Sequence, residues 1–399
     1  MLFSLTAIET FILIVAVFSL LYFLLPQKWN AVSFLFVVFA LAALAFYIEP
    51  NETDDLTRYF AIIDDLRVYG YNYLTRCIDE GIFDWDTYRV CGYYFYFVSK
   101  LSSSHYLPAI TIFMVYGLMF FILYRVSIRF EVGKWYLYIG AMIFLTTYWY
   151  YDTVSGIRNG LVFAIVLACA YYQFVEKKHI LLCLAGYVLS CFLHAAAIIP
   201  VILAIVVMLT ANITGNYIKY FMFFGITIGS GLISYLSEIT DNDFIQTLAA
   251  KVDANADSSF SMQTNYIVNI TLLIVAILVW YYLNFYFKNS QKGKDFSLFM
   301  KYIDLIIFFM LGSIFNPLIF LRFARWMLPI IVAIIFMVGM QVQKDKIQKE
   351  PDYNYYQDAM PDERWRYQSK GMFTLIVCGY IAVHFYYLCA GSSIVWMHF

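Results

Sequence analysis

Arginines at the ends of long apolar segments are the residues of this sequence with the clearest capacity for chemistry. Arg158 lies in the segment DTVSGIRNG, and Arg322 and Arg325 lie three residues apart in NPLIFLRFARWM. A charge beside a long apolar run is rare unless it serves a purpose. Guanidinium groups bind phosphate with paired hydrogen bonds and stay charged at physiological pH. We therefore expect these arginines to bind a pyrophosphate; the alternatives are anchors at a membrane interface or an ion pair with Asp152.

Three further polar residues are candidates for proton transfer in such a site. A carboxylate can accept the proton of an acceptor hydroxyl, with Asp55 the first choice and Asp152 the second. His194, in CFLHAAAIIP, is the reserve candidate, because imidazole can accept a proton or donate a hydrogen bond to a sugar or phosphate oxygen. The alternative interpretation of a lone histidine at a tight helical turn is a helix cap or an interface residue.

The segment 50–106 supplies most of the residues suited to contact sugars. Its acidic, arginine and aromatic residues alternate with apolar ones at helical spacing, which indicates amphipathic helices on a membrane surface. Carboxylates accept hydrogen bonds from hydroxyls, and aromatic rings cover the apolar faces of sugars. The expected sugar-binding residues are Arg58, Tyr59 and Trp85 from this segment and Asn159 from DTVSGIRNG. The alternative interpretation is an interfacial anchor with paired surface charges.

Composition places the chain in a membrane. Of its 399 residues, 63% are hydrophobic and 13% are charged, against roughly 45–50% and 25% in ordinary soluble domains. A water-soluble fold of this size is therefore excluded. The 26 Lys and Arg residues nearly balance the 27 Asp and Glu residues, so the chain has no overall basic field for nucleic acid.

Motifs for metals and nucleotides are absent from the sequence. There is no CxxC, no HExxH, no other metal-ligand cluster and no glycine-rich phosphate loop. We expect no metal and no cofactor, and neither ATP nor a nucleotide sugar has an obvious binding motif. The energy for any reaction would then have to come with a lipid-linked substrate.

Twelve apolar stretches are candidates for membrane crossing, which takes about 20 residues per helix. They comprise residues 5–25, 30–49, 106–126, 135–153, 158–176, 179–193, 195–212, 217–237, 264–287, 297–314, 324–342 and 372–390. With the N-terminus outside, most of the 26 basic residues fall on the cytoplasmic side, as the positive-inside rule expects. The sequence thus predicts a single all-α integral membrane domain over residues 1–399, with about 12 transmembrane helices and both termini outside.

Three connecting segments of this predicted topology are long. Segment 50–106 is an external loop with amphipathic helices, and its aromatic stretch 90–101 is too short to span, so we expect a re-entrant or interfacial helix there. Segment 238–263 is an external acidic loop, and segment 343–370 is a polar cytoplasmic loop. The external loop also holds Cys77 and Cys91. A disulfide between them is one alternative if the loop faces an oxidising compartment, and the spacing alone does not decide it.

Several short sequence elements, predicted to share one side of the membrane, follow one another along residues 45–340. They are D-x-x-R-Y (Asp55, Arg58, Tyr59), I-R-N (Ile157, Arg158, Asn159) with a following basic turn (Glu176, Lys177, Lys178), F-L-H (His194) and R-x-x-R (Arg322, Arg325). In these elements the chain resembles the EpsG-type, Wzy-like polymerases of bacterial capsular and exopolysaccharides. That family usually has glutamine after the arginine of the second element; Asn159 keeps the amide but shortens its reach.

The resemblance implies a reaction class. It implies a GT-C-like helical fold in the bacterial inner membrane, with a cavity on the periplasmic side. There a growing glycan on undecaprenyl pyrophosphate would be joined to the next lipid-linked repeat unit, without metal or nucleotide, to give capsular, exo- or O-antigen polysaccharide. Membrane lipid and a chain-length regulator protein are the candidate partners. We interpret Arg158, helped by Arg322 and Arg325, as the group that holds the donor pyrophosphate and offsets the charge that develops as the glycosidic bond breaks.

Two other functions stay open from the sequence. A glycan ligase would move finished polymer from the same carrier to lipid A or protein, and its outer-face arginines would look alike. A flippase or transporter of lipid-linked sugar predicts ionisable residues at several mid-span positions and internal pseudo-symmetry. Here the ionisable residues gather at the outer ends of the predicted spans, which favours the polymerase.

Overall fold

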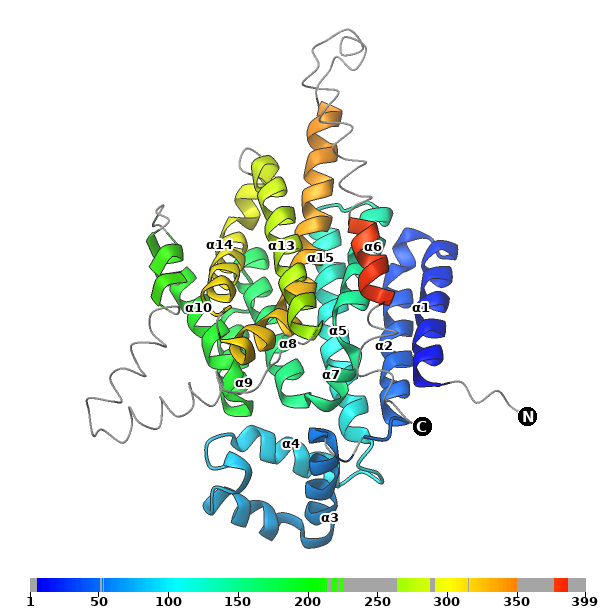
Figure 1. The fold of residues 1–399 in the computed structure, drawn as a ribbon, viewed down its shortest axis with the longest axis vertical. Helices are drawn as coiled ribbons and strands as arrows, with labels where there is room; N and C mark the ends of the chain where they lie inside the picture. The colour runs from blue at the N-terminus through cyan, green and yellow to red at the C-terminus, as the bar shows by residue number, and fades with distance from the viewer. Residues whose placement is uncertain are drawn as a thin grey trace.

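The protein is a bundle of helices (Figure 1). The structure, a computed structural model, describes residues 6–50, 52, 54–211, 213, 217–221, 223–225, 264–287, 291–314, 316–349 and 377–386. Within these ranges the regular elements are helices and there is no strand. The predicted acidic loop 238–263 and most of the predicted span 217–237 lie outside the described residues.

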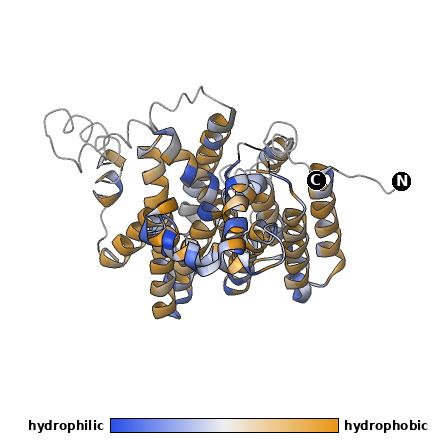
Figure 2. Cartoon of the chain, turned by 90° about the horizontal axis from the view of Figure 1, so that it is seen from below, coloured by the Kyte–Doolittle hydropathy of each residue, from blue (hydrophilic) through white to orange (hydrophobic). Residues whose placement is uncertain are grey.

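Long apolar helices form the frame of the bundle. They are α1 (Ala7–Leu24), α2 (Asn30–Phe46), α5 (Tyr106–Arg129), α8 (Ile157–Tyr171) and α15 (Pro317–Lys349). A turn of 3-10 helix precedes α2 and a π-helical turn extends α8, and five helices among the described residues are thus long and apolar enough to cross a membrane. Hydrophobic residues dominate the helices of the bundle in the view of Figure 2. Since each lies where the sequence predicts a span, the chain is a membrane protein.

Other helices, from 6 to 24 residues long, pack beside these five. They are α6 (Lys134–Thr147), α7 (Tyr150–Ser155), α9 (Ile180–Leu193), α10 (Ile198–Leu209), α13 (Thr264–Phe287), α14 (Gln291–Gly312) and a helix over residues 377–386. Several are shorter than a hydrocarbon core requires. The total of twelve spans, the orientation of the chain and the GT-C-like fold therefore stay predictions.

Two predicted spans have different bounds in the structure. The single helix expected over residues 135–153 is wrong, because Tyr148 and Trp149 adopt extended backbone conformations that separate α6 from α7. The helix expected over residues 324–342 is too short at both ends. As α15 it begins at Pro317 and continues to Lys349, into the segment expected to be a polar loop. Both differences concern helix ends, where the polar residues of interest lie.

The segment 50–106 forms a layer of two helices across one end of the bundle (Figure 1). These are α3 (Asp55–Asp79) and α4 (Arg89–Ser99), and α4 lies across the bundle end and packs against α9 and α5. A break at Gly70, with φ +68° and ψ −150°, turns α3 onto α4, and glycine adopts this conformation without steric cost. We call α3 and α4 the end layer. Its Cys77 and Cys91 are both buried free thiols, so the structure holds no bridge between them.

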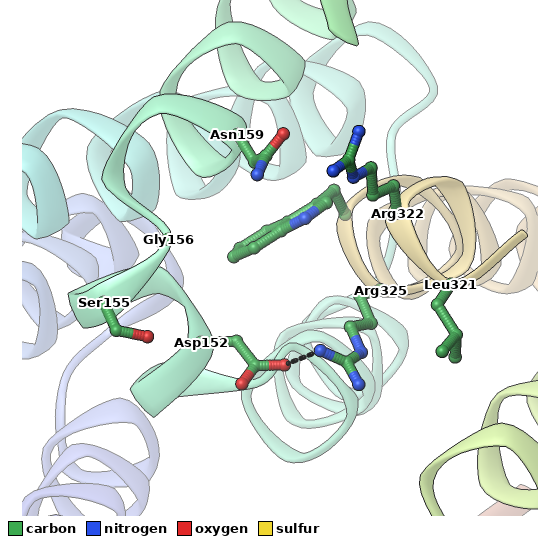
Figure 3. Close-up of a pocket in the computed structure, with 8 residues that line it drawn as sticks. Asp152, Ser155, Gly156, Asn159, Leu321, Arg322 and Arg325 are labelled. Carbon is green, nitrogen blue, oxygen red and sulfur yellow. Dashed lines mark ion pairs between the residues drawn. The ribbon is translucent and has the colours of Figure 1, made fainter. Parts of the chain in front are cut away.

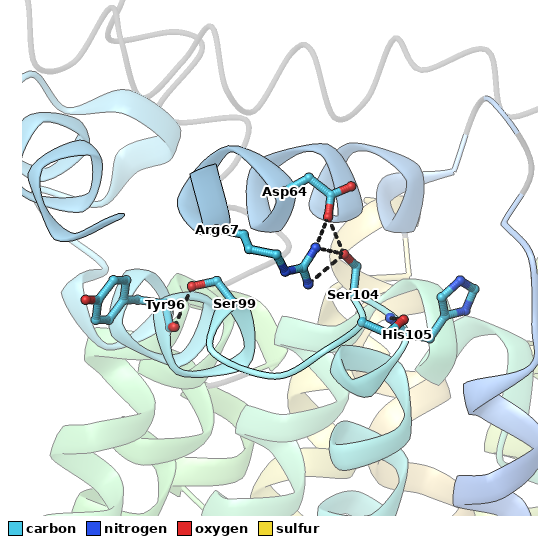
Figure 4. Close-up of polar contacts among 7 residues, drawn as sticks. Asp64, Arg67, Tyr96, Ser99, Ser104 and His105 are labelled. Atoms are coloured by element: carbon cyan, nitrogen blue, oxygen red, sulfur yellow. Dashed lines mark hydrogen bonds and ion pairs between the residues drawn. The ribbon is translucent and has the colours of Figure 1, made fainter. Parts of the chain in front are cut away.

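A polar contact fixes the end layer to the bundle (Figure 4). The carboxylate of Asp64 accepts a hydrogen bond of 2.6 Å from the hydroxyl of Ser104, just before α5, and pairs with Arg67 one turn along α3. Arg67 also lies 3.4 Å from the Ser104 hydroxyl. The network joins α3 to the start of α5, so the end layer has a defined position over the ends of the bundle helices.

Candidate active site

A cavity of about 220 Å³ lies at the end of the bundle where α7 contacts α3 of the end layer, and Figure 3 shows the residues that line it. It is formed by α7, the first turn of α8 and the beginning of α15. Its lining residues are Asp152, Ser155, Gly156, Asn159, Leu321, Arg322, Arg325 and Trp326. Four of the residues predicted from the sequence thus share one cavity, although they come from segments more than 150 positions apart.

Small residues let α15 approach α8 at this cavity. A Cβ on Gly156 would lie 2.6 Å from the backbone oxygen of Asp152 and 3.3 Å from the ring of Trp326. A Cβ on Gly160 would lie 3.1 Å from Thr153 and 3.3 Å from the same ring. The sharp junction between α7 and α8 therefore needs glycine at position 156, and Trp326 fills the space that the two glycines leave.

The beginning of α15 sets the positions of two arginines. Asn316 accepts a hydrogen bond of 3.4 Å from the Ile319 N–H, and Pro317 occupies the first helical position, where its fixed φ favours helix initiation. Arg322 and Arg325 follow within the next turns. Figure 3 shows Arg325 directed at Asp152 and Arg322 on the side of Asn159.

Arg325 and Asp152 form an ion pair inside the cavity. Nη1 of Arg325 lies 2.8 Å from Oδ2 of Asp152, and both side chains are about four-fifths buried, with 21% and 16% exposed. The guanidinium also lies 4.9 Å from the ring centroid of Trp149, at the distance of a cation–π contact. The sequence left open that an arginine of the site forms an ion pair with Asp152. The arginine that does so is Arg325, and not Arg158.

Arg158 is held by the end layer. Its Nε donates a hydrogen bond of 3.2 Å to the hydroxyl of Tyr59, and its guanidinium lies 5.6 Å from the Tyr59 ring centroid. Tyr59 is buried and packs edge-on against Phe95 of α4, with ring centroids 5.2 Å apart. In this structure Tyr59 therefore supports the guanidinium and presents no free ring face to a sugar.

Arg322 has no ion pair in the part of the chain that the structure describes. Its charge interacts with those of Arg158 and Asp55 and acts on His194, and none of these three residues lines the cavity. The first N–H groups of α8 lack intrahelical acceptors, and a helix N-terminus favours negative charge. The Oδ1 of Asn159 is buried and unpaired among the described residues. Two cations, Arg322 and Arg325, and the first turn of α8 thus line a space that suits a phosphate group, and Arg158 is not among the lining residues.

His194 caps a helical turn and is neutral. Its Nδ1 accepts a hydrogen bond of 3.1 Å from the N–H of Ala196, so the ring proton resides on Nε2. Burial, reinforced by the charges of Arg158 and Arg322, lowers the pKa of His194 to about 3. The ring stacks on Tyr88, with centroids 6.0 Å apart. The helix cap predicted as the alternative is present, and the imidazole is suited to donate a hydrogen bond from Nε2 and unsuited to accept a proton.

The remaining predicted residues belong to the end layer. Asp55 and Arg58 form an exposed ion pair of 2.8 Å within one helical turn, and neither residue lines the cavity. Trp85 is 1% exposed and packs against Phe95 and Gly92, so its ring has no free face for a sugar. The burial of Trp85 depends on how α4 folds back on α3. A local sequence pattern does not indicate this contact.

Sequence reasoning missed several residues that shape the cavity. They are Trp149, Ser155, Gly156, Leu321 and Trp326. Each is adjacent or nearly adjacent to a residue that was predicted, and the small pair Ser155 and Gly156 before Arg158 was the available signal for a tight helix junction.

The fold and the cavity together define a class: a helical membrane protein with an arginine-lined, anion-attracting site at one end of its bundle. The sequence profile of the EpsG family matches residues 57–350, which include every element of this site except Asp55. The chain belongs to the EpsG family, which indicates a glycosyltransferase-like polysaccharide polymerase. No curated protein and no solved structure gives a significant match to the chain.

Proposed function

We propose that the protein polymerises undecaprenyl-pyrophosphate-linked repeat units into a cell-surface polysaccharide at the outer face of the bacterial inner membrane. One observation carries this proposal. Arg322, which has no ion pair among the described residues, lines a cavity of about 220 Å³ together with Arg325 and the first turn of α8, and the charge of Arg158 acts on Arg322. This combination suits a pyrophosphate, which is the leaving group of a lipid-linked sugar.

The reaction is the transfer of the donor glycan to a hydroxyl of the acceptor repeat unit. The acceptor oxygen forms a bond to the anomeric carbon while the bond from that carbon to the pyrophosphate breaks. Arg158 and Arg322 offset the negative charge that grows on the departing lipid pyrophosphate. A carboxylate at the site, Asp55 or Asp152, takes the proton of the acceptor hydroxyl. His194 donates from Nε2 to a sugar or phosphate oxygen, and Arg58 and Asn159 contact sugar hydroxyls.

Substitution of Arg158 tests the proposal. Arg158→Ala should abolish polymer while the protein remains in the membrane, and Arg158→Lys should restore little, because a point charge replaces a planar fork. Arg76→Ala is the matched control, since Arg76 is an exposed arginine of α3 whose partner is Glu80. The readout is a gel of cell-surface glycan and lipid-linked oligosaccharides from a deletion strain complemented with each variant. Polymer of wild-type length from Arg158→Ala would refute the proposal.

The same gel separates the alternatives. A deletion strain that accumulates single repeat units on the outer leaflet and loses the ladder supports polymerisation. Long chains retained on the carrier lipid would identify a ligase, and repeat units trapped on the cytoplasmic leaflet would identify a flippase.

A further inference from the structure

The ion pair between Asp152 and Arg325 is unusual for its place, because it occupies the cavity that the substrate must enter. We propose that Asp152 is the general base of the transfer and that Arg325 is a counter-ion which the pyrophosphate of the bound substrate draws away from it. The inference rests on the proposed function and deepens it, by naming which carboxylate acts and what controls it.

Position favours Asp152 over the two other candidates. Asp152 lines the cavity itself, together with Arg322 and Asn159. Asp55 is more than half exposed, is paired with Arg58 and does not line the cavity. His194 already carries its proton on Nε2 and uses Nδ1 to accept the Ala196 N–H. Of the three, Asp152 is the group that can accept a proton inside the cavity.

Arg325 is placed to exchange one anion for another. It follows Arg322 by three residues on α15, so the two guanidiniums lie on neighbouring turns beside one cavity. The Nε of Arg325 is buried and unpaired among the described residues, so the fork has an unused donor. A pyrophosphate carries more negative charge than one carboxylate and offers more acceptor oxygens, and it competes for this fork as it settles beside Arg322.

Loss of the counter-ion would make Asp152 a stronger base. α7 (Tyr150–Ser155) is not one of the five helices that are long and apolar enough to cross a membrane. Burial raises the pKa of Asp152, Arg325 opposes this, and the nearby charge of Asp54 adds to the rise. Asp54 in turn accepts a hydrogen bond from Tyr151. When the pyrophosphate takes Arg325, burial and Asp54 act unopposed, and the affinity of the carboxylate for a proton increases at the moment when the substrate is in place.

The step balances within the proposed reaction. The carboxylate of Asp152 takes the proton as the acceptor oxygen bonds to the anomeric carbon, and the electron pair of the broken bond leaves with the lipid pyrophosphate. Arg325 stabilises that leaving group together with Arg158 and Arg322. Release of the lipid pyrophosphate lets Arg325 return, which favours loss of the proton from Asp152 to water.

The test uses the full-length protein in lipid, with lipid-linked repeat units isolated from a polymerase-deletion strain. Asp152→Asn should lower kcat by roughly 10²–10⁴-fold without weakening donor binding, because the amide keeps the size of the side chain and leaves Arg325 free for the pyrophosphate. Asp79→Asn, an exposed carboxylate at the end of α3, is the matched control and should behave as wild type.

Removal of the counter-ion gives a second, independent readout. In Arg325→Ala the acidic limb of the kcat/KM profile should move to higher pH, since Asp152 in the free protein then lacks Arg325, while KM rises through loss of a pyrophosphate contact. A role limited to structure would leave that limb in place. If Asp152→Asn does not fold, this profile still decides the question.

The outcomes separate this inference from the proposed function. Near-normal kcat in Asp152→Asn, loss of kcat in Asp55→Asn instead, or an unmoved pH limb in Arg325→Ala would each overturn the role of Asp152. In each of these three cases, loss of polymer in Arg158→Ala would still support the assignment as a polymerase. Normal polymer in Arg158→Ala would refute the assignment itself.

Discussion

The hydroxyl of Tyr59 joins the end layer to Arg158, and its removal tests how the site is held. Tyr59→Phe keeps the ring against Phe95 and deletes the acceptor that lies 3.2 Å from Arg158 Nε. A hydrogen bond to a charged group contributes about 1.5–3 kcal/mol. Because a tenfold rate change corresponds to about 1.4 kcal/mol, kcat should fall by roughly 10- to 150-fold if the geometry of Arg158 matters only in the transition state.

The assay for Tyr59→Phe is the initial rate of chain extension in lipid at several donor concentrations. Tyr94→Phe is the matched control: Tyr94 is another tyrosine of the end layer, whose hydroxyl lies 2.9 Å from that of Thr111 and makes no contact with Arg158. Both variants should lose a similar amount of thermal stability, and only Tyr59→Phe should lose kcat. Equal kcat in the two variants would refute the reasoning that Tyr59 positions Arg158.

Two further predictions concern the helix junctions at the site. Gly156→Ala places a Cβ 2.6 Å from the Asp152 carbonyl oxygen, so α7 and α8 must separate, and we expect a lower Tm and little polymer. Gly117→Ala is the control, because its Cβ would meet only Val38, at 3.9 Å. This variant should be close to wild type in both assays. His194 has a pKa of about 3, below the ordinary value of about 6.5, so the unfolded state binds the extra proton and stability falls as pH falls from about 6.5 towards 3. His194→Asn keeps an acceptor at the cap and should show a shallower dependence of Tm on pH; parallel curves would contradict this.

The membrane helices were largely predictable because their signal is local. A run of apolar residues long enough to cross the hydrocarbon core is read directly, and α1, α2, α5 and α8 lie where those runs are. The ends were less predictable. The break between α6 and α7 occurs inside an apolar and aromatic stretch, where composition does not change. Hydropathy therefore located the helices and did not locate the junction that forms the cavity wall.

The candidate site was predictable as a set of residues and not as a set of contacts. Arg322 and Arg325 were singled out because a charge beside an apolar run is costly, Asp152 as a proton acceptor and Asn159 as a sugar-binding residue, and the structure brings all four to one cavity. Which of these residues pair with one another depends on helix packing. Trp326 packs against Gly156 and Gly160, and this contact fixes the position of α15 relative to α8. In that position Arg325, and not Arg158, pairs with Asp152.

By itself the sequence determined that this chain is a helical membrane protein of the EpsG family with its arginines at helix ends, because apolar run length, charge position and motif order are properties of neighbouring residues. Only the tertiary structure decided what those residues contact. It buried Tyr59 and Trp85 in the end layer, made His194 a neutral cap and left Arg322 without an ion pair in the described part of the chain. The physical reason is that burial and ion pairing depend on how helices far apart in the sequence pack together, and a local sequence pattern does not specify that packing.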